Sequence, residues 1–451
     1  MSSRDLWRTL YERFDPELPA PLPWRAPRPH SPAQKILDTL DRPFGTPRIL
    51  LAGTVGTGKT TELLHIAEER EERELVVFLD LARHFAEVVK DPHALDRIHS
   101  WEVCFLAGLG LVSRFKQRLQ FELDPEMVKQ LGRAWQGLAV ATGAPEPQLD
   151  LGSFAKDALD LGATLAAASP EVVGLGLGLK AVKSVVGAVK AWNLPLGRSE
   201  KPLPDQDRRV QDLLGAVNLL VGEVQSKHRK VVFVIDGLDR IRDVERAKAL
   251  FVESQLLSQL DCPVVVCGPF ALRHHLATAG VRGFKPMALV NEPVLDHDHP
   301  ERPGKGVEFF CEMYAQRVKD LGAQVQGLVS RELLVELAYR SGGRARDFVR
   351  FIRSLAEVGW DRDAPAATLE AVKQVLDEWR LRQETGLNTG HIQLLEEVAK
   401  DPMHRLPANA LAHELLNYQH LLPYPNDSEW YYPHPLLTMH LVRTSPSGSG
   451  A

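Results

Sequence analysis

The stretch Gly53-Thr-Val-Gly-Thr-Gly-Lys59-Thr60 carries the clearest chemistry in this 451-residue sequence. It fits the pattern GxxxxGK[ST], with an apolar stretch before it and a helical stretch after it. Glycines let the backbone turn tightly and approach a phosphate without an intervening Cβ, so that several N–H groups face the anion. The pattern therefore predicts a loop that binds ATP, or another nucleoside triphosphate, together with Mg²⁺.

The residues of this loop have separate predicted roles. Lys59 should reach the β- and γ-phosphates, and the Thr60 hydroxyl should bind Mg²⁺. The loop backbone and the first turn of the following helix should surround the phosphates. The predicted nucleotide-binding residues are Gly53, Thr54, Val55, Gly56, Thr57, Gly58, Lys59, Thr60 and Thr61.

Two aspartates follow another apolar stretch, residues 231–235. Asp236 ends that stretch and is the predicted acidic partner of Mg²⁺, while Asp239 could orient or deprotonate the attacking water. The plainer alternatives are an ordinary strand-ending aspartate for Asp236 and one of many loop aspartates for Asp239. We predict catalytic roles for Lys59, Asp236 and Asp239, with Thr60 and Asp236 as the metal ligands.

The elements that position these residues follow from the apolar pattern. Continuous apolar stretches separated by helical ones are typical of a parallel sheet that is covered on both faces. The predicted fold class is therefore α/β, a P-loop NTPase sheet with helices on both faces. The predicted strands are residues 48–52, 75–80, 230–236 and 263–267, with a weaker fifth at 286–290.

Beyond residue 300 the pattern is helical, at about 305–321, 330–340, 345–358 and 368–383. Residues 391–442 then indicate two helices, a hairpin and a last helix, which is a winged-helix-like arrangement. The predicted domains are an N-terminal helix with a proline-rich arm (1–45), the NTPase domain (46–300, with a helical Gly/Ala-rich insertion at about 83–205), an all-α lid (301–385), the winged-helix-like domain (386–444) and a disordered tail (445–451).

The sequences from Gly56 to Leu63 and from Val234 to Ile241 resemble the STAND branch of signalling P-loop ATPases, which includes NACHT and NB-ARC proteins. More closely, the arrangement resembles bacterial STAND-like or AAA+-like ATPases with a helical lid and a winged-helix end. The resemblance covers about 46–80, 206–300 and 301–442. It implies an ATP-binding molecular switch with slow or assembly-dependent hydrolysis, whose partners are further copies of the chain or a separate effector in bacterial signalling or antiviral defence.

The start of the predicted lid helix at 345, Gly343-Arg344-Ala-Arg346, resembles the Gly-x-x-Arg sensor-2 signature of AAA+ ATPases. The resemblance implies a catalytic role for Arg346 at the γ-phosphate, with Arg344 as the alternative. A basic helix start making surface ion pairs is the plainer interpretation. The fourth apolar stretch ends at Cys267, where neither a polar sensor-1 residue nor a Thr-x-Arg is clear, although Arg273 could substitute.

Composition excludes some classes of protein. The chain is 44% hydrophobic and 25% charged, with a formal net charge of -5, so its surface is not uniformly basic as in many nucleic-acid-binding proteins. Four scattered cysteines without a CxxC pair suggest neither a zinc site nor a disulfide framework. With no signal-peptide-like or bilayer-spanning apolar stretch, we expect a reducing cytoplasm.

Two alternatives stay open. An AAA+ remodelling or DNA-associated ATPase, of the initiator or transposition-regulator type, also joins a lid to a winged helix. DNA is not favoured, because residues 407–417 contain no lysine or arginine to contact phosphates. Residues 172–192 place Lys180, Lys183 and Lys190 on one helical face, which could lie on an anionic membrane surface. The glycines of this stretch weaken a free-standing helix, so a structural insertion or an oligomer contact is favoured.

Overall fold

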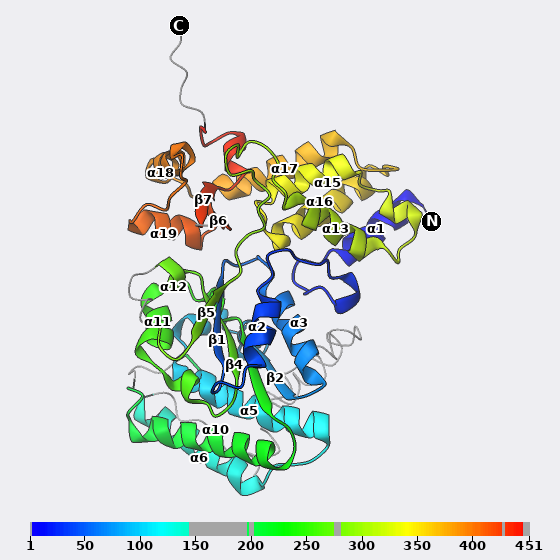
Figure 1. Cartoon of the computed structure of the whole chain (residues 1–451). Coiled ribbons are helices and arrows are strands. Elements are labelled where there is room, and N and C mark those ends of the chain that lie inside the picture. Colours follow the sequence, from blue (N-terminus) through cyan, green and yellow to red (C-terminus); the bar gives the residue numbers. More distant parts are fainter. Residues whose placement is uncertain (1, 144–195, 198–202, 275–280, 426–428, 445–451) are drawn as a thin grey trace. The chain divides into compact units, whose positions relative to one another are not determined.

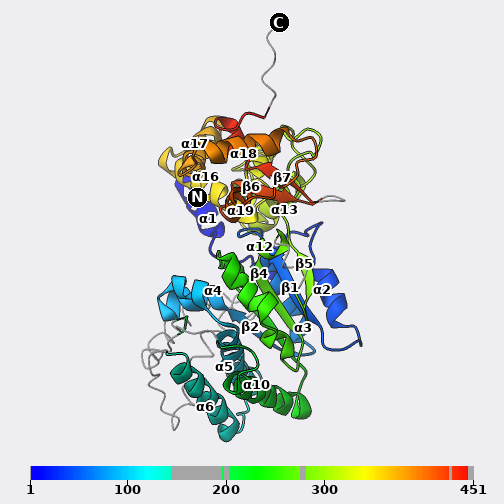
Figure 2. The ribbon, with the colours of Figure 1, turned by 90° about the vertical axis from the view of Figure 1, so that its left-hand side faces the viewer.

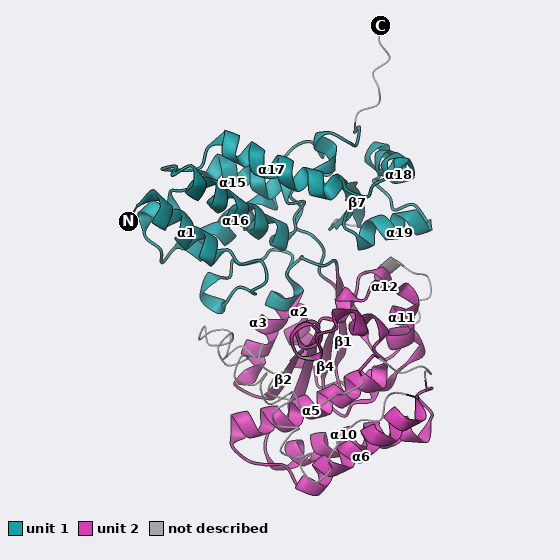
Figure 3. Ribbon diagram, turned by 180° about the vertical axis from the view of Figure 1, so that it is seen from behind, with its two compact units in different colours: residues 1–31, 54–61, 289–451 teal, residues 32–53, 62–288 magenta. Residues whose placement is uncertain are grey.

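The computed structural model describes residues 2–143, 196–197, 203–274, 281–425 and 429–444. Its contacts divide the chain into two compact units (Figure 3). Unit 1 comprises residues 1–31, 54–61 and 289–451, and unit 2 comprises 32–53 and 62–288. The glycine-rich loop thus belongs to unit 1, whereas the strand before it belongs to unit 2. The predicted lysine face at 172–192 and the tail from 445 lie outside the described residues.

Unit 2 contains a sheet of five parallel strands in the order β2-β3-β4-β1-β5, and all five predicted strands are confirmed (Figure 1). Along β1 and β4, Gly53 lies opposite Pro269, and along β2 and β3, Asp80 lies opposite Asp236. The carboxyl ends of these strands therefore meet at one edge of the sheet. The strands are β1 (Arg48–Gly53), β2 (Leu75–Asp80), β3 (Val231–Asp236), β4 (Val264–Pro269) and β5 (Lys285–Ala288).

Both faces of this sheet are buried, as its continuous apolar strands require. On one face, Val77 and Phe233 join the helices α5 (Ser100–Leu119), α6 (Pro125–Ala141) and α10 (Arg208–Lys227) in one hydrophobic cluster. Figure 1 shows these three helices packed together beside the sheet. On the other face, Val76 and Val234 are also buried. Helix α5 lies within residues 83–205, where the sequence predicts a helical insertion.

Several shorter helices complete unit 2. Helix α3 begins at Lys59, within the glycine-rich motif, and α4 begins directly after β2. A one-turn 3-10 helix, η6 (Leu238–Arg240), follows β3. The further helices are α2 (Ala33–Leu40), α3 (Lys59–Glu71), α4 (Leu81–His84), α11 (Val244–Lys248) and α12 (Ala271–His274).

The helical part of unit 1 confirms the four predicted helices beyond residue 300. The N-terminal helix α1 (Ser3–Arg13) packs on α16, where Gly359 leaves room for the indole ring of Trp7. The Trp7 Nε1 donates a hydrogen bond to the Ala364 carbonyl at 2.7 Å. The other helices are α13 (Val307–Val318), α14 (Ala323–Gln326), α15 (Arg331–Arg340), α16 (Ala345–Asp361) and α17 (Leu369–Glu384).

The last part of unit 1 contains α18 (Thr389–Lys400), α19 (Ala410–Asn417) and an antiparallel hairpin of β6 (Leu421–Tyr424) and β7 (Trp430–Pro433) (Figure 2). This confirms the two helices and the hairpin of the winged-helix-like arrangement. The predicted last helix is wrong, since only the 3-10 turn η10 (Leu437–Met439) forms. Within the part of the chain that the structure describes, no helix has the length and apolar character needed to cross a membrane.

Candidate active site

The glycine-rich loop has backbone conformations that favour glycine at two positions. Gly56 and Gly58 have φ angles of 92° and 99°, which L-residues rarely adopt. A Cβ on Gly56 would also lie 3.1 Å from a terminal nitrogen of Arg344. The loop therefore has the turn geometry that its sequence pattern predicts.

Lys59 folds back over this loop. Its ammonium group donates a hydrogen bond to the Thr54 carbonyl at 2.6 Å, and the side chain of this residue is buried. The Thr57 hydroxyl donates to the same carbonyl at 2.9 Å. A buried cation is stabilised more by a charged oxygen than by a neutral one, so a phosphate group is a better acceptor for Lys59 than this carbonyl.

Both arginines of the predicted sensor-2 signature contact the loop. The guanidinium of Arg344 donates to the Val55 carbonyl at 3.1 Å. The backbone N–H of Arg346 donates to the Gly56 carbonyl at 3.0 Å. The structure thus brings both residues to the loop, and which of them would contact a phosphate stays a prediction.

The glycine pair before α16 packs closely against two other segments of unit 1. Gly342 and Gly343 have φ angles of 63° and 78°. A Cβ on Gly343 would collide with the backbone of Glu292, and one on Gly342 with the side chain of Leu422. The Glu292 N–H donates to the Gly343 carbonyl at 3.1 Å. Glycine is therefore required for this close approach.

Arg344 belongs to a polar cluster, the Arg344 network, which comprises the buried Arg344, Asp347 and His434 and the partly buried Gln419. The guanidinium of Arg344 donates to the Asp347 carboxylate and to the Gln419 side chain. The His434 Nε2 lies 3.5 Å from the same carboxylate. The network joins the loop, the start of α16 and the winged-helix-like part within unit 1.

Electrostatic interactions within this network stabilise the charged form of Asp347. Burial alone would raise the pKa of Asp347, but the positive charge of Arg344 and the interactions with His434 hold that pKa at about 2. Burial lowers the pKa of His434, against the stabilising effect of Asp347 on its charged form. Sequence reasoning missed Asp347, Gln419 and His434, and only the position of Asp347 beside Arg346 could have indicated one of them.

The proline-rich arm supplies another contact that sequence reasoning missed. Arg28 donates hydrogen bonds to the carbonyls of Thr57 and Val290, and forms an ion pair with Glu292 at 2.6 Å. The side chains of Arg28 and Glu292 are only 5% and 0% exposed. This buried pair ties the arm to the loop, and the arm's proline content gave no sign of it.

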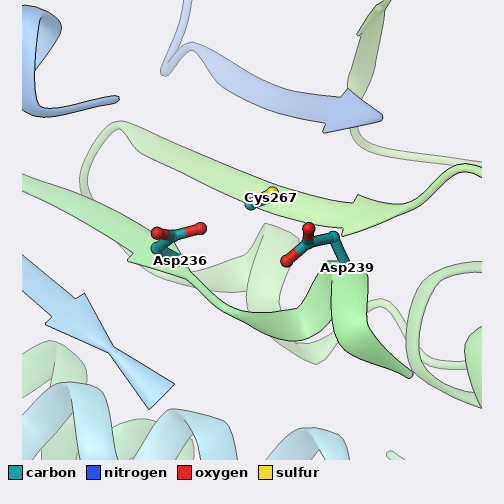
Figure 4. Close-up of side chains that lie close together, drawn as sticks. All are labelled: Asp236, Asp239 and Cys267. Atoms are coloured by element: carbon teal, nitrogen blue, oxygen red, sulfur yellow. The ribbon is translucent and has the colours of Figure 1, made fainter. Parts of the chain in front are cut away.

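Unit 2 brings the two predicted aspartates together and adds a cysteine (Figure 4). Asp236 ends β3, Asp239 lies on η6, and Cys267 lies on β4. One ligand atom from each residue lies within 4.8 Å of those from the other two. Gly237 allows the turn between the aspartates, because its φ is 96° and a Cβ would collide with the backbone of Ala82.

A third carboxyl group, which the sequence gave no reason to single out, lies at this sheet edge. Asp80 ends β2 opposite Asp236, and its carboxylate accepts a hydrogen bond from the Arg83 N–H at 2.9 Å. Burial raises the pKa of Asp80, and the negative charge of Asp239 adds to this effect, while Arg240 and Arg83 oppose it. An acidic strand edge of this kind can hold a divalent cation and orient a water molecule.

Neither known family models nor curated protein sequences give a match to the chain. Among solved structures, Drosophila ORC bound to DNA is 12% identical over 87% of this chain and 72% of its own, with a TM-score of 0.38. The Aeropyrum pernix ORC1 protein in complex with DNA is 12% identical over 92% and 94%, also with a TM-score of 0.38. The Aeropyrum pernix ORC2 protein in its ADP form is 11% identical over 94% and 94%, with the same TM-score. Similarity this low leaves the function to be argued from the chain's own residues.

Proposed function

We propose that this chain is an ATP-binding and slowly ATP-hydrolysing molecular switch of the STAND type. One observation carries the proposal: three consecutive carbonyls of the glycine-rich loop are held by distant parts of the same unit. The carbonyls of Val55, Gly56 and Thr57 accept hydrogen bonds from the Arg344 side chain, the Arg346 backbone N–H and the Arg28 side chain, respectively. A loop shaped for phosphate is thereby linked mechanically to the lid helices and to the arm.

The residues of the loop and of the acidic edge fit a nucleotide with its cation. Lys59 would exchange the Thr54 carbonyl for phosphate oxygens, and the start of α3 would face them with its N–H groups. Thr60 and Asp236 would hold Mg²⁺, which when bound neutralises charge on the phosphates. Asp239 would orient the attacking water and accept its proton.

The Arg344 network would transmit the state of the loop. Arg344 and Asp347 are both buried, so separating them leaves uncompensated charges, and an intermediate arrangement is unfavourable. The network would therefore favour two discrete arrangements, closed as observed or fully open. Opening would free α16 and the winged-helix-like part for self-assembly or for a separate effector, as in bacterial signalling and antiviral defence.

A DNA-associated ATPase is the alternative. Helix α19 contains no lysine or arginine, so the second helix of the winged-helix-like part lacks the side chains that usually contact DNA phosphates. If the alternative holds, DNA should stimulate hydrolysis, and binding should weaken steeply as the salt concentration rises. No response to DNA at low salt would remove it.

The proposed function is tested by ATP binding and hydrolysis of the full chain, the Lys59→Ala variant and the Asp239→Asn variant. Lys59→Ala should lose binding, because it removes the cation that faces the phosphates. Asp239→Asn should keep binding and lose about 10²-fold in turnover, the usual contribution of a general base. A Lys59→Ala variant that binds and hydrolyses ATP like the unmodified chain would show that the site is wrongly assigned.

A further inference from the structure

Asp236, one of the two residues assigned to Mg²⁺, also belongs to a cluster with Asp239 and Cys267 whose ligand set is unusual for Mg²⁺. The cluster offers two carboxylate oxygens and one sulfur, and Figure 4 shows the two carboxyl groups turned toward each other beside the thiol. Mg²⁺ takes oxygen ligands in octahedral geometry, whereas thiolates favour ions such as Zn²⁺ and Co²⁺. We propose that these three residues bind a thiophilic divalent cation of the Zn²⁺ class.

The backbone fixes the positions of all three ligands. Ile235 of β3 pairs with Val266 of β4, so Asp236 and Cys267 are the next residues along two adjacent parallel strands. Side chains at matching positions of neighbouring strands lie on the same face of a sheet. The single turn of η6 then returns Asp239 to this point.

The distances suit a small tetrahedral ion. The three ligand atoms lie within 4.8 Å of one another. Zinc bonds of the usual length place tetrahedral ligands roughly 3.4–3.6 Å apart. Asp236 and Cys267 are buried on strands, whereas Asp239 is only partly buried. A small rotation of the Asp239 side chain would therefore bring the ligand atoms to the shorter distances. Three protein ligands leave the fourth position open.

Ion binding at this site would displace one proton. The metal–sulfur bond forms as the Cys267 S–H bond breaks, and the proton leaves to solvent, so affinity should rise with pH. This inference rests on the proposed function in one respect: Asp236 would be a ligand both of Mg²⁺ and of the Zn²⁺-class ion. A Zn²⁺-class ion at this site would therefore compete with Mg²⁺ and inhibit ATP turnover.

The test is a Co²⁺ titration of the full chain without nucleotide, followed by absorption spectroscopy. One equivalent of Co²⁺ should give a near-ultraviolet thiolate-to-cobalt charge-transfer band and release about one proton. Cys267→Ser should abolish the band. Cys311→Ser, which alters the most exposed of the four thiols, should retain it.

A second variant and a second control keep the result interpretable. Asp239→Asn should weaken Co²⁺ binding by about tenfold or more while leaving the far-ultraviolet circular dichroism unchanged. Lys59→Ala should bind Co²⁺ like the unmodified chain, so failure of nucleotide binding and failure of metal binding can be distinguished. The absence of a charge-transfer band, or an identical band in folded Cys267→Ser, would overturn the inference.

Discussion

The guanidinium of Arg344 donates a hydrogen bond to the backbone carbonyl of Val55 at 3.1 Å. This contact joins the N-cap residue of α16, directly after a glycine pair, to a loop nearly 290 residues earlier in the sequence. Because Arg344 is also paired with the buried Asp347, the contact belongs to a charged network rather than to an isolated surface pair. Removing only one partner of such a pair leaves a buried charge uncompensated, which is strongly destabilising. The network is therefore suited to two discrete states.

Removing Arg344 should weaken the closed state. In Arg344→Ala, we expect faster release of a fluorescent ATP analogue and more self-assembly, because the loop loses its link to α16. Stopped-flow fluorescence and mass photometry measure the two effects. Arg331→Ala is the matched control, since Arg331 forms only an exposed pair with Glu308. The single variant leaves Asp347 buried without its partner. The double variant Arg344→Ala/Asp347→Asn should therefore release the analogue at the same rate as Arg344→Ala but be more stable. Equal release rates in the variants and in the unmodified chain would contradict the prediction.

The glycine pair before α16 gives a prediction on stability. Gly343→Ala should destabilise unit 1 by about 2–4 kcal/mol, from a left-handed backbone and a collision with the backbone of Glu292. Gly386 has a φ of 87° but no atom within 4 Å of a built Cβ, so Gly386→Ala tests the backbone effect alone. It should lower stability by only about 1 kcal/mol. Urea unfolding of both variants measures the difference, and equal losses would show that the close approach at Gly343 is not needed.

Much of the fold could be predicted from the sequence. The five strands follow from continuous apolar stretches, and the lid helices follow from apolar residues at helical spacing, because both patterns are set by burial. The last helix was wrongly predicted, because the residues after Pro435 form only the 3-10 turn η10. The order of the strands could not be predicted, because strand order depends on long-range packing and leaves no local pattern.

The candidate site could be predicted only where a motif marks it. The loop and the two aspartates have fixed spacing within short segments. Arg28, Glu292 and His434 come from segments hundreds of residues apart, and each is a common residue in an ordinary local sequence. Cys267 was noticed only as a departure from a familiar pattern, and its closeness to two carboxyl groups depends on how β3 and β4 pair.

The buried His84 predicts a loss of stability in acid. Neither ring nitrogen has a hydrogen-bond partner among the described residues, and burial lowers the pKa of His84 to about 4. The unfolded chain binds this proton near pH 6.5 and the folded chain does not, so stability falls as the pH drops from about 6.5 to 4. At pH 5 the loss from this group should be about 2 kcal/mol.

Urea unfolding at pH 7.5 and pH 5.0 measures this effect. His84→Leu should show a smaller loss of stability between the two pH values than the unmodified chain. His93→Leu, at an exposed position of the same unit, should lose as much as the unmodified chain. An unchanged pH dependence in His84→Leu would show that His84 does not titrate as its burial indicates.

The pair between Arg28 and Glu292 should stabilise the arm. Arg28→Ala leaves the Glu292 carboxylate buried with only the half-exposed His30 beside it, at 3.1 Å. We expect a destabilisation of about 3–5 kcal/mol, as for other broken buried pairs. Arg8→Ala is the control, because Arg8 is exposed and forms only a surface pair with Asp5. Thermal unfolding measures both, and an Arg28→Ala variant as stable as the control would contradict the prediction.

The central claim is that nucleotide at the glycine-rich loop changes the Arg344 network. Hydrogen–deuterium exchange of the peptide that contains Arg346 tests it most directly, because the N–H of Arg346 donates to the Gly56 carbonyl. ATP with Mg²⁺ should change exchange at this N–H and around His434 in the unmodified chain, and should change neither in Lys59→Ala. Saturating ATP binding without any change in exchange at these positions would contradict the account.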